Sequence, residues 1–293
     1  MTTAAVNGIE IYYEERGNAD DPTVLLIMGL GAQMTVWPDE FVDDLVQRGN
    51  RVIWFDNRDV GLSTKFHDAC PNADQLIAAL FVGGEVDPPY GLTDMSDDAV
   101  GLLDHLGVGA AHIVGASMGG MIAQQVVVDH PDRALSLTSI MSTTGESHVG
   151  AASPDVIIKM VEPQAPDREM AIAQGVEMAK VIASPDHWDE EIATERITVQ
   201  YDRCNHPPGQ ARQLLAVLTS PSREEGLARF DKPALVVHGH LDQLVGVSGG
   251  HRTAEVLPDV ETLFIEDMAH DLPRAYWPTI ADAIEETIKK ADR

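Results

Sequence analysis

Short apolar blocks alternate with amphipathic segments along this chain, and the alternation predicts strands separated by helices. The apolar blocks are continuous and rich in Val, Ile and Leu, which is typical of strands buried on both faces. Strands are predicted at residues 23–28, 51–56, 135–141, 234–238 and 261–265, and another from residue 111. Helical spacing of apolar residues predicts helices at residues 39–49, 93–106, 118–130, 249–257 and 276–290. The predicted fold class is therefore α/β, with a mostly parallel, twisted sheet.

The beginning of the chain departs from this alternation. Residues 2–6 and 9–17 are predicted to be two strands joined by a tight turn at Asn7-Gly8. The sheet therefore opens with an antiparallel hairpin.

The alternation also stops between residues 143 and 229. Helical segments are predicted there at residues 170–182 and 211–218, and no convincing strand accompanies them. We therefore predict that residues 143–229 form a helical cap insertion. The core of the protein then consists of two parts, residues 1–142 and residues 230–293.

Residues 115–119 have the spacing Gly-x-Ser-x-Gly, with Ser117 at the centre. A β-branched run precedes this motif and an apolar, helix-like segment follows it, which is the strand–turn–helix context of a nucleophile elbow. Gly115 and Gly119 allow the strand and helix backbones to approach closely while Ser117 occupies a sharp turn. We predict that Ser117 is a nucleophile; the alternative is an ordinary turn between a strand and a helix.

A serine hydroxyl is a weak nucleophile, and it needs a histidine base that a carboxylate orients. Reactive groups in an open parallel sheet gather just beyond the carboxyl ends of the strands. His270 lies in the loop after a late strand, and Asp242 lies in the loop after the strand ending at His238. We therefore predict a catalytic triad of Ser117, Asp242 and His270.

Alternatives to these assignments come from the same region of the chain. Glu146 is the second candidate for the acid, because it follows the strand that ends at Met141. Asp242 is otherwise a turn-forming aspartate, and His270 a loop histidine with a structural hydrogen bond. The histidines set aside are His206 in the insertion, His251 in a predicted helix, and His238 and His240, which precede the predicted acid.

Two backbone N–H groups are needed to stabilise the oxyanion of a tetrahedral intermediate. One is expected from Met118, the residue after the nucleophile, and the other from the loop after the strand at residues 23–28. In that loop Gly29 and Gly31 supply backbone freedom on both sides of Leu30. We therefore predict Leu30 and Met118 as the oxyanion donors, the alternative for residues 29–31 being an ordinary loop.

The charge of the chain limits its partners. It has 47 acidic and 20 basic residues, giving a net charge of −27, which repels phosphate backbones and anionic membrane surfaces. We therefore predict neither a nucleic-acid nor a membrane partner. A well-solvated acidic surface explains the charge, with adaptation to high salt as the alternative.

Cysteine spacing and hydropathy indicate the cellular environment of the protein. Cys70 and Cys204 lie far apart without metal-ligand spacing, which predicts neither a disulfide framework nor a structural zinc site. No run approaches the roughly 18 apolar residues that span a membrane, and the first residues carry no secretory signal. We expect a cytoplasmic protein, whose oligomeric state the sequence does not indicate.

Several short segments, spread along nearly the whole chain except the insertion, resemble motifs of a known protein family. They are Met28-Gly29-Leu30-Gly31, Trp37-Pro38-Asp39-Glu40-Phe41, residues 55–63, the Ser117 elbow, Gly239-His240-Leu241-Asp242 and Ala269-His270. Together they resemble the α/β-hydrolase superfamily, most closely the aclacinomycin methylesterase group of bacterial serine esterases. The resemblance implies the same triad and oxyanion donors, a cap, and a structural role for the loop at residues 56–63. The chain departs from many superfamily members at Met28-Gly29, where they have His-Gly.

These features predict a serine esterase that cleaves a small-molecule carboxylic ester through an acyl-enzyme, with no cofactor and no metal. A serine nucleophile argues against haloalkane dehalogenase and epoxide hydrolase chemistry, for which the resembling families use aspartate. Carbon–carbon bond hydrolysis, lactone hydrolysis and perhydrolysis remain alternatives on the same fold. A ligand-binding protein without catalytic activity is the alternative from another class.

Overall fold

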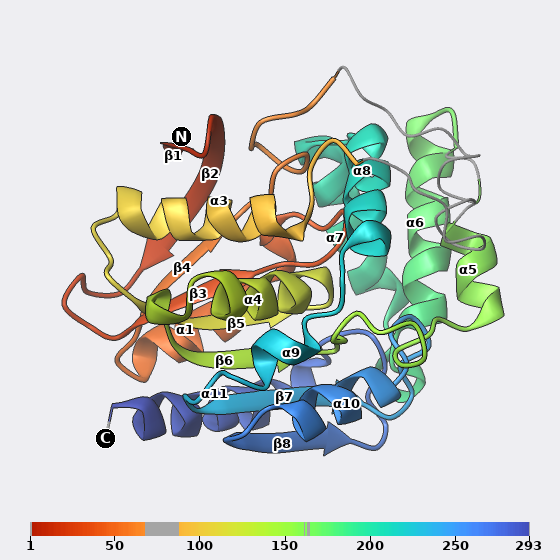
Figure 1. The fold of residues 1–293 in the computed structure, drawn as a ribbon. Coiled ribbons are helices and arrows are strands. Elements are labelled where there is room, and N and C mark those ends of the chain that lie inside the picture. Colours follow the sequence, from red (N-terminus) through yellow and green to blue (C-terminus); the bar gives the residue numbers. More distant parts are fainter. Residues whose placement is uncertain (1, 68–87, 161, 163–164, 293) are drawn as a thin grey trace.

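The computed structural model describes residues 2–67, 88–160, 162 and 165–292, which build an eight-stranded sheet between two layers of helices (Figure 1). The strand order is β1-β2-β4-β3-β5-β6-β7-β8. The strands are β1 (Thr3–Val6), β2 (Ile9–Arg16), β3 (Thr23–Ile27), β4 (Arg51–Phe55), β5 (Ala111–Ala116), β6 (Ala134–Ile140), β7 (Ala234–Gly239) and β8 (Val260–Ile265). β2 pairs antiparallel with β1 and β4, and every other pairing is parallel. The predicted fold class and its antiparallel opening hairpin are confirmed.

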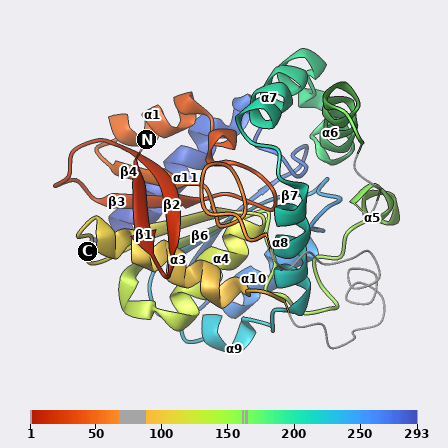
Figure 2. The same cartoon turned by 90° about the horizontal axis from the view of Figure 1, so that it is seen from above.

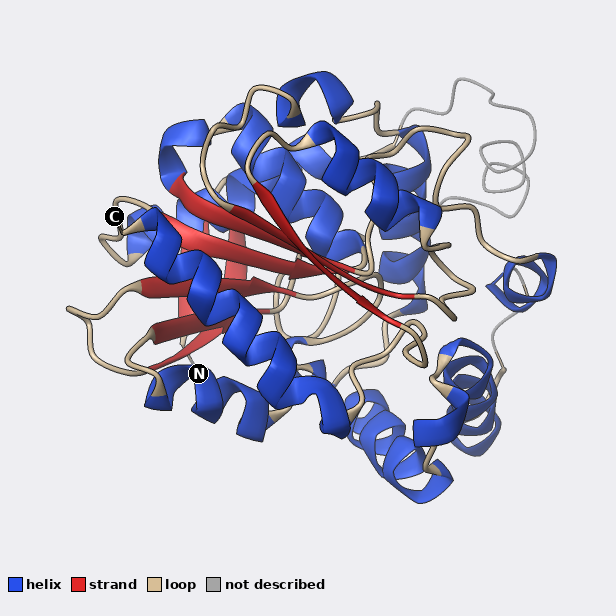
Figure 3. Cartoon of the chain, turned by 90° about the horizontal axis from the view of Figure 1, so that it is seen from below, coloured by secondary structure: helices blue, strands red, loops and turns tan. Residues whose placement is uncertain are grey.

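Helices cover both faces of the sheet, which explains why the central strands are buried throughout and mostly apolar. In β3, β4, β5 and β7 every residue is buried. Figures 2 and 3 view the molecule from above and from below, with helices on both sides of the strands. The first face carries α3 (Leu92–His105), α4 (Met118–Asp129) and α10 (Ser248–Val256), and the second carries α1 (Asp39–Gln47) and α11 (Trp277–Ala291).

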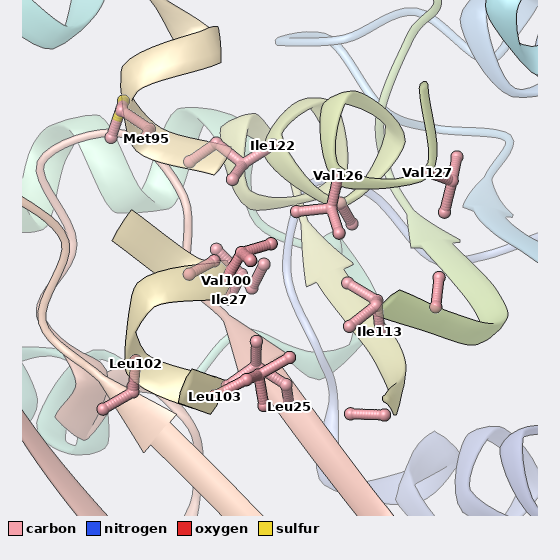
Figure 4. Close-up of a cluster of buried hydrophobic side chains, with 14 of the residues drawn as sticks. Leu25, Ile27, Met95, Val100, Leu102, Leu103, Ile113, Ile122, Val126 and Val127 are labelled. Carbon is pink, nitrogen blue, oxygen red and sulfur yellow. The ribbon is translucent and has the colours of Figure 1, made fainter. Parts of the chain in front are cut away.

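The core under α3 and α4 fixes the strand that ends at the serine (Figure 4). Ile113 of β5 and Leu25 of β3 lie in this buried cluster, and Ile122 and Val126 follow one another at helical spacing along α4. Since β5 is held between β3 and β6, the turn that follows it has a fixed position.

The insertion is helical in the part of the chain that the structure describes. Its helices are α5 (Pro154–Met160), α6 (Arg168–Ile182), α7 (Glu190–Arg203), α8 (Pro207–Thr219) and α9 (Glu224–Leu227). No strand lies among the described residues of 143–229, and α5 to α8 stand at the end of the sheet where β8 finishes (Figure 1). The helices predicted at 170–182 and 211–218 lie within α6 and α8, whereas α5, α7 and α9 were not predicted. The division into two core parts and a cap domain stays a prediction.

Short 3-10 turns connect several elements. They lie at Met34–Val36 (η1), Pro131–Arg133 (η2), Pro185–His187 (η3) and Arg274–Tyr276 (η4). The turn η1 follows the loop after β3, which approaches Ser117, and η3 follows the end of α6, which contacts the loop of His270.

Candidate active site

Ser117 occupies a strained turn between β5 and α4. Its backbone angles are φ 58° and ψ −126°, in the left-handed half of conformational space that non-glycine residues rarely adopt. A Cβ atom at Gly115 would lie 2.0 Å from the Gly119 carbonyl oxygen, and one at Gly119 would lie 2.1 Å from the carbonyl oxygen of Ile27. The two glycines of the motif are therefore required by the close approach of strand and helix backbones.

Three side chains that are distant in the sequence form one hydrogen-bonded chain. His270 Nε2 lies 2.9 Å from Ser117 Oγ, and His270 Nδ1 lies 2.7 Å from Asp242 Oδ2. Asp242 follows β7 and His270 follows β8, so all three residues stand at the carboxyl ends of parallel strands. The structure thus brings together the three residues predicted as a triad, with a geometry that allows proton transfer from Ser117 to His270.

The Asp242 carboxylate is held by more than His270. Its Oδ1 accepts hydrogen bonds from the backbone N–H groups of Leu244 and Val245, at 2.9 and 2.8 Å. Burial raises the pKa of Asp242, but the attraction to His270 and hydrogen bonds from two histidines outweigh this effect and lower the pKa to about 2. The carboxylate is therefore ionised at neutral pH and can stabilise a protonated His270.

The second histidine at this carboxylate is His238, which the sequence reasoning set aside. It is fully buried in β7, and its Nε2 lies 2.8 Å from the Val245 carbonyl oxygen and 3.2 Å from Asp242 Oδ2. Its Nδ1 has no hydrogen-bond partner among the described residues and faces Gly250 of α10. Because Nε2 must donate to the carbonyl oxygen, this imidazole carries its proton on Nε2. His238 thereby directs the same N–H toward Asp242 Oδ2, the oxygen that also contacts His270.

The loop of His270 is bonded to the insertion. The N–H of His270 donates to the Ile182 carbonyl oxygen over 2.9 Å, and the N–H of Ala269 donates to Ser184 Oγ over 2.8 Å. Asp271 accepts from both the N–H and the hydroxyl of Ser184. Burial raises the pKa of Asp271, although these hydrogen bonds oppose the rise. The residues that follow α6 therefore help to position the loop of the candidate base.

The loop after β3 lies directly against the serine. A Cβ atom at Gly29 would lie 2.9 Å from Ser117 Cβ, so only glycine allows this approach. Among the described residues, neither the Leu30 N–H nor the Met118 N–H donates to an acceptor. Both predicted oxyanion donors are thus available beside Ser117, and their catalytic role stays a prediction.

The alternative acid lies in a different network. Glu146 accepts a hydrogen bond from Thr144 Oγ1 at 2.6 Å and pairs with Arg252 at 3.2 Å. Burial raises the pKa of Glu146, but its hydrogen bonds and the charge of Arg252 outweigh this and lower it. His270 is bonded to Asp242 instead, so the geometry favours Asp242 as the acid.

The remaining histidines named from the sequence also have other contacts. His206 lies 3.7 Å from Asp59 in a buried ion-pair network, and His251 stacks on Phe264 with ring centroids 4.2 Å apart. His240 lies 3.6 Å from the exposed Glu266. Within the described ranges none of these three forms a hydrogen bond with Ser117, so His270 is the histidine that the fold brings to the serine.

The loop at residues 56–63 is built into the core. Arg58 forms a buried ion pair with Asp98 of α3 at 2.6 Å, and Asp59 forms another with Arg212 of α8 at 2.8 Å. The first pair lies within the core and the second joins the core to the insertion. They are consistent with a structural role for the loop.

The described residues hold no metal cluster and no membrane-spanning helix. Among these, no group of three or more His, Cys, Asp or Glu side chains is arranged to hold a metal ion, and no helix is both long and apolar enough to cross a membrane. Cys204 is a free, half-buried thiol. Cys70 lies outside the described residues, so the prediction of no disulfide stays untested, as does the cytoplasmic location.

The sequence and the fold are similar to those of known proteins. Residues 22–273 match the family model of the alpha/beta hydrolase fold, which covers most of the chain. The protein belongs to the α/β-hydrolase family. Both the fold class and the resemblance noted from the sequence are thereby confirmed, and the molecule is a hydrolase of this fold.

Curated relatives of this α/β hydrolase include esterases and a carbon–carbon hydrolase. It is 28% identical to the rhodomycin D methylesterase DauP of a Streptomyces species, over 94% of both chains. It is 26% identical to a 2-hydroxy-6-oxononadienedioate/2-hydroxy-6-oxononatrienedioate hydrolase of Burkholderia vietnamiensis, over 86% of this chain and 82% of the relative. These relatives support the assignment as a hydrolase and leave several substrates open.

Solved structures of low sequence identity share the fold of this hydrolase. The enol-lactonase of Burkholderia xenovorans superposes with a TM-score of 0.72 at 20% identity, covering 99% of both chains. A meta-cleavage product hydrolase of Pseudomonas fluorescens superposes with a TM-score of 0.76 at 17% identity, covering 99% of this chain and 98% of the other. At these identities the likeness establishes the architecture alone.

Proposed function

We propose that this hydrolase cleaves a carboxylic ester of a small molecule through an acyl-enzyme on Ser117. The observation that carries the proposal is the hydrogen-bonded chain from Ser117 Oγ through His270 to Asp242, at 2.9 and 2.7 Å. A serine oriented in this way can lose its proton to the imidazole as it attacks a carbonyl carbon. The methylesterase relatives, at 28% identity over 94% of the chain, support an ester as the substrate.

The proposed reaction has two halves. In the first, His270 takes the Ser117 proton, Ser117 Oγ bonds to the ester carbonyl carbon, and His270 returns the proton to the leaving alcohol. The Leu30 and Met118 N–H groups stabilise the oxyanion, and ionised Asp242 stabilises the imidazolium. In the second half, water loses a proton to His270 and attacks the acyl-enzyme, which releases the acid and regenerates the serine. No cofactor is required by these steps.

The test is hydrolysis of p-nitrophenyl esters of increasing acyl length by the wild type and by Ser117→Ala. An aromatic methyl ester is added to the panel because the relatives include methylesterases. We expect turnover by the wild type and a loss of at least about a thousandfold in Ser117→Ala, since a missing nucleophile removes the covalent path. Circular dichroism shows that both proteins fold.

Other outcomes distinguish the alternatives. Turnover that persists in folded Ser117→Ala contradicts the proposal. If no ester is turned over but a lactone is, the triad belongs to a lactonase. Turnover of a ring-fission dione assigns it to a carbon–carbon hydrolase, and formation of a peracid assigns it to a perhydrolase. Tight ligand binding without any turnover supports a non-catalytic binding protein.

A further inference from the structure

The loop after β3 that approaches Ser117 is bonded to a side chain of the insertion. The N–H of Gly31 donates to Gln213 Oε1 over 2.8 Å, and Gln213 Nε2 donates to the Arg58 carbonyl oxygen over 2.7 Å. Gln213 lies in α8 and is fully buried. A buried amide that is hydrogen-bonded at both its oxygen and its nitrogen has a fixed orientation, because rotation would leave two polar groups unpaired.

The other end of this amide rests on a rigid part of the core. Arg58, whose carbonyl oxygen accepts from Gln213, has its guanidinium in a buried ion pair with Asp98 at 2.6 Å. Asp59 pairs with Arg212, the residue next to Gln213 in α8, at 2.8 Å. The position of the Gln213 amide is therefore fixed by contacts on two sides that do not involve the loop it holds.

The loop itself needs such a restraint. Gly29 and Gly31 flank Leu30, and Gly31 has φ +66°, so the peptides on either side of Leu30 have the freedom of glycine. Rotation of the peptide between Leu30 and Gly31 would turn the Leu30 backbone relative to Ser117. The hydrogen bond from Gly31 N–H to Gln213 opposes that rotation.

The hydrogen bond to Gln213 also determines which N–H groups of the loop are free to donate. Gly31 N–H is engaged by Gln213, and Ala32 N–H donates to the Gly29 carbonyl oxygen over 3.3 Å. Leu30 N–H, which precedes both, donates to no acceptor among the described residues. Gln213 thus occupies one N–H of the loop and leaves its neighbour available to an oxyanion.

We propose that Gln213 is a positioning residue for the oxyanion: from the insertion it orients the loop so that the Leu30 N–H meets the negative oxygen that forms at Ser117. The inference rests on the proposed function, since it assigns Gln213 a part in the same reaction. A side chain with this role acts when charge develops on the oxygen, so its loss lowers kcat more than it raises KM.

The experiment compares Gln213→Met with the wild type on the best p-nitrophenyl ester. Met matches the length of Gln but provides neither hydrogen bond. We expect kcat to fall by about 10- to 100-fold, because removal of an oxyanion donor costs about 100- to 1000-fold and misplacement costs less. KM should change by less than about threefold. The inhibition constant of a trifluoromethyl ketone with the same acyl chain, which forms an oxyanion on Ser117, should rise in parallel with the loss of kcat.

Two further variants separate positioning from packing. Gln210, on the same helix, packs its side chain against Gly31 and has no hydrogen bond among the described residues, so Gln210→Met should keep the wild-type kcat. Gln213→Glu is the conservative variant, because a protonated carboxyl accepts from Gly31 and donates to the Arg58 carbonyl oxygen. It should recover ketone affinity relative to Gln213→Met. If Gln213→Met does not fold, Gln213→Asn takes its place, since it lacks the methylene needed to reach both partners.

The outcomes keep the two proposals apart. Wild-type kcat and ketone affinity in folded Gln213→Met or Gln213→Asn overturn this inference and leave the serine esterase standing, provided that Ser117→Ala is inactive. Equal impairment of Gln213→Met and Gln210→Met assigns the effect to packing and also overturns it. Turnover that survives Ser117→Ala overturns the inference together with the proposed function.

Discussion

The backbone N–H of His270 donates to the carbonyl oxygen of Ile182 over 2.9 Å, so the last residue of α6 is bonded to the residue that lies against Ser117. Ser184 extends this contact by accepting from Ala269 N–H and donating to Asp271. The insertion therefore does more than cover the end of the sheet: it completes the hydrogen bonds of the loop that carries the candidate base.

Ser184→Ala removes a hydroxyl that is bonded on both sides. The buried N–H of Ala269 would lose its partner, and the half-buried Asp271 would keep only the Ser184 N–H; an unsatisfied buried group costs about 1–3 kcal/mol. We expect the free energy of unfolding in urea to fall by about that amount, with a lower kcat because the His270 loop is less restrained.

Thr194→Ala is the matched control for this change. The Thr194 hydroxyl is exposed on α7 and donates only to the Glu190 carbonyl oxygen of its own helix. Its removal should change the free energy of unfolding by no more than about 0.5 kcal/mol. If both substitutions lower the free energy of unfolding equally, the contact of Ser184 with the His270 loop does not contribute to stability beyond an exposed hydroxyl.

Gly250→Ala tests the contact between His238 and Asp242 without touching either side chain. The added methyl group would lie 2.5 Å from His238 Nδ1, in a ring that is fully buried, so the imidazole has to shift from its place beside Asp242. Because a displacement of about 1 Å in a catalytic group can cost up to about a hundredfold, we expect kcat to fall between about ten- and a hundredfold.

Gly109→Ala provides the comparison, because a Cβ atom there meets no atom within 4 Å. This variant should keep the wild-type kcat on the same ester. The interpretation of His238 fails if Gly250→Ala, shown to be folded by circular dichroism, retains the activity of Gly109→Ala.

His112 predicts a loss of stability in acid. It is fully buried in β5, with Nδ1 2.9 Å from Ser136 Oγ and Nε2 without a partner among the described residues. Burial lowers the pKa of His112 below its ordinary value of 6.5. The folded protein then binds fewer protons than the unfolded chain, so this contribution to stability is present above pH 6.5 and is lost as the pH falls below it.

The measurement is the melting temperature of wild type, His112→Leu and His148→Ala between pH 8 and pH 5. His148 is a histidine with an exposed side chain, and its variant should show the same fall in melting temperature as the wild type. His112→Leu should show a smaller fall, because no buried imidazole has to be protonated when it unfolds. Parallel curves for all three proteins would contradict the assignment.

Much of the fold follows from local patterns in the sequence. The continuous apolar strands and the helix after Ser117 were predictable because both faces of β5 are covered, so every residue of the strand is buried and most are apolar. Asp242 and His270 could be selected because parallel strands end at one edge of the sheet. Their proximity to Ser117 is therefore a consequence of topology, which the order of strands and helices already contains.

The parts that were not predicted depend on contacts without a local pattern. Helix α7 has no buried residue, and its Ile192 is exposed, so no apolar stripe indicates it; its only signal is Asp189, which accepts from two N–H groups of the first turn. Gln213 and Ser184 hold loops that are far away in the chain, and nothing in their neighbouring residues shows this. His238 was set aside by its position ahead of Asp242, although a buried polar residue in a strand needs a partner.

The ion pair between Asp59 and Arg212 fixes helix α8 of the insertion against the core. Both side chains are fully buried, and separating them would expose two unpaired charges to an apolar interface, at a cost of about 3–5 kcal/mol. Helix α8 is therefore held firmly against the core. Helix α7 buries no residue, but its last residue, Arg203, pairs with the buried Asp56 at 2.7 Å. A chimaera that receives foreign helices in the insertion should therefore keep its fold only if it retains residues 182–184, 200–204 and 206–219, which hold the His270 loop, Gln33 and Asp59.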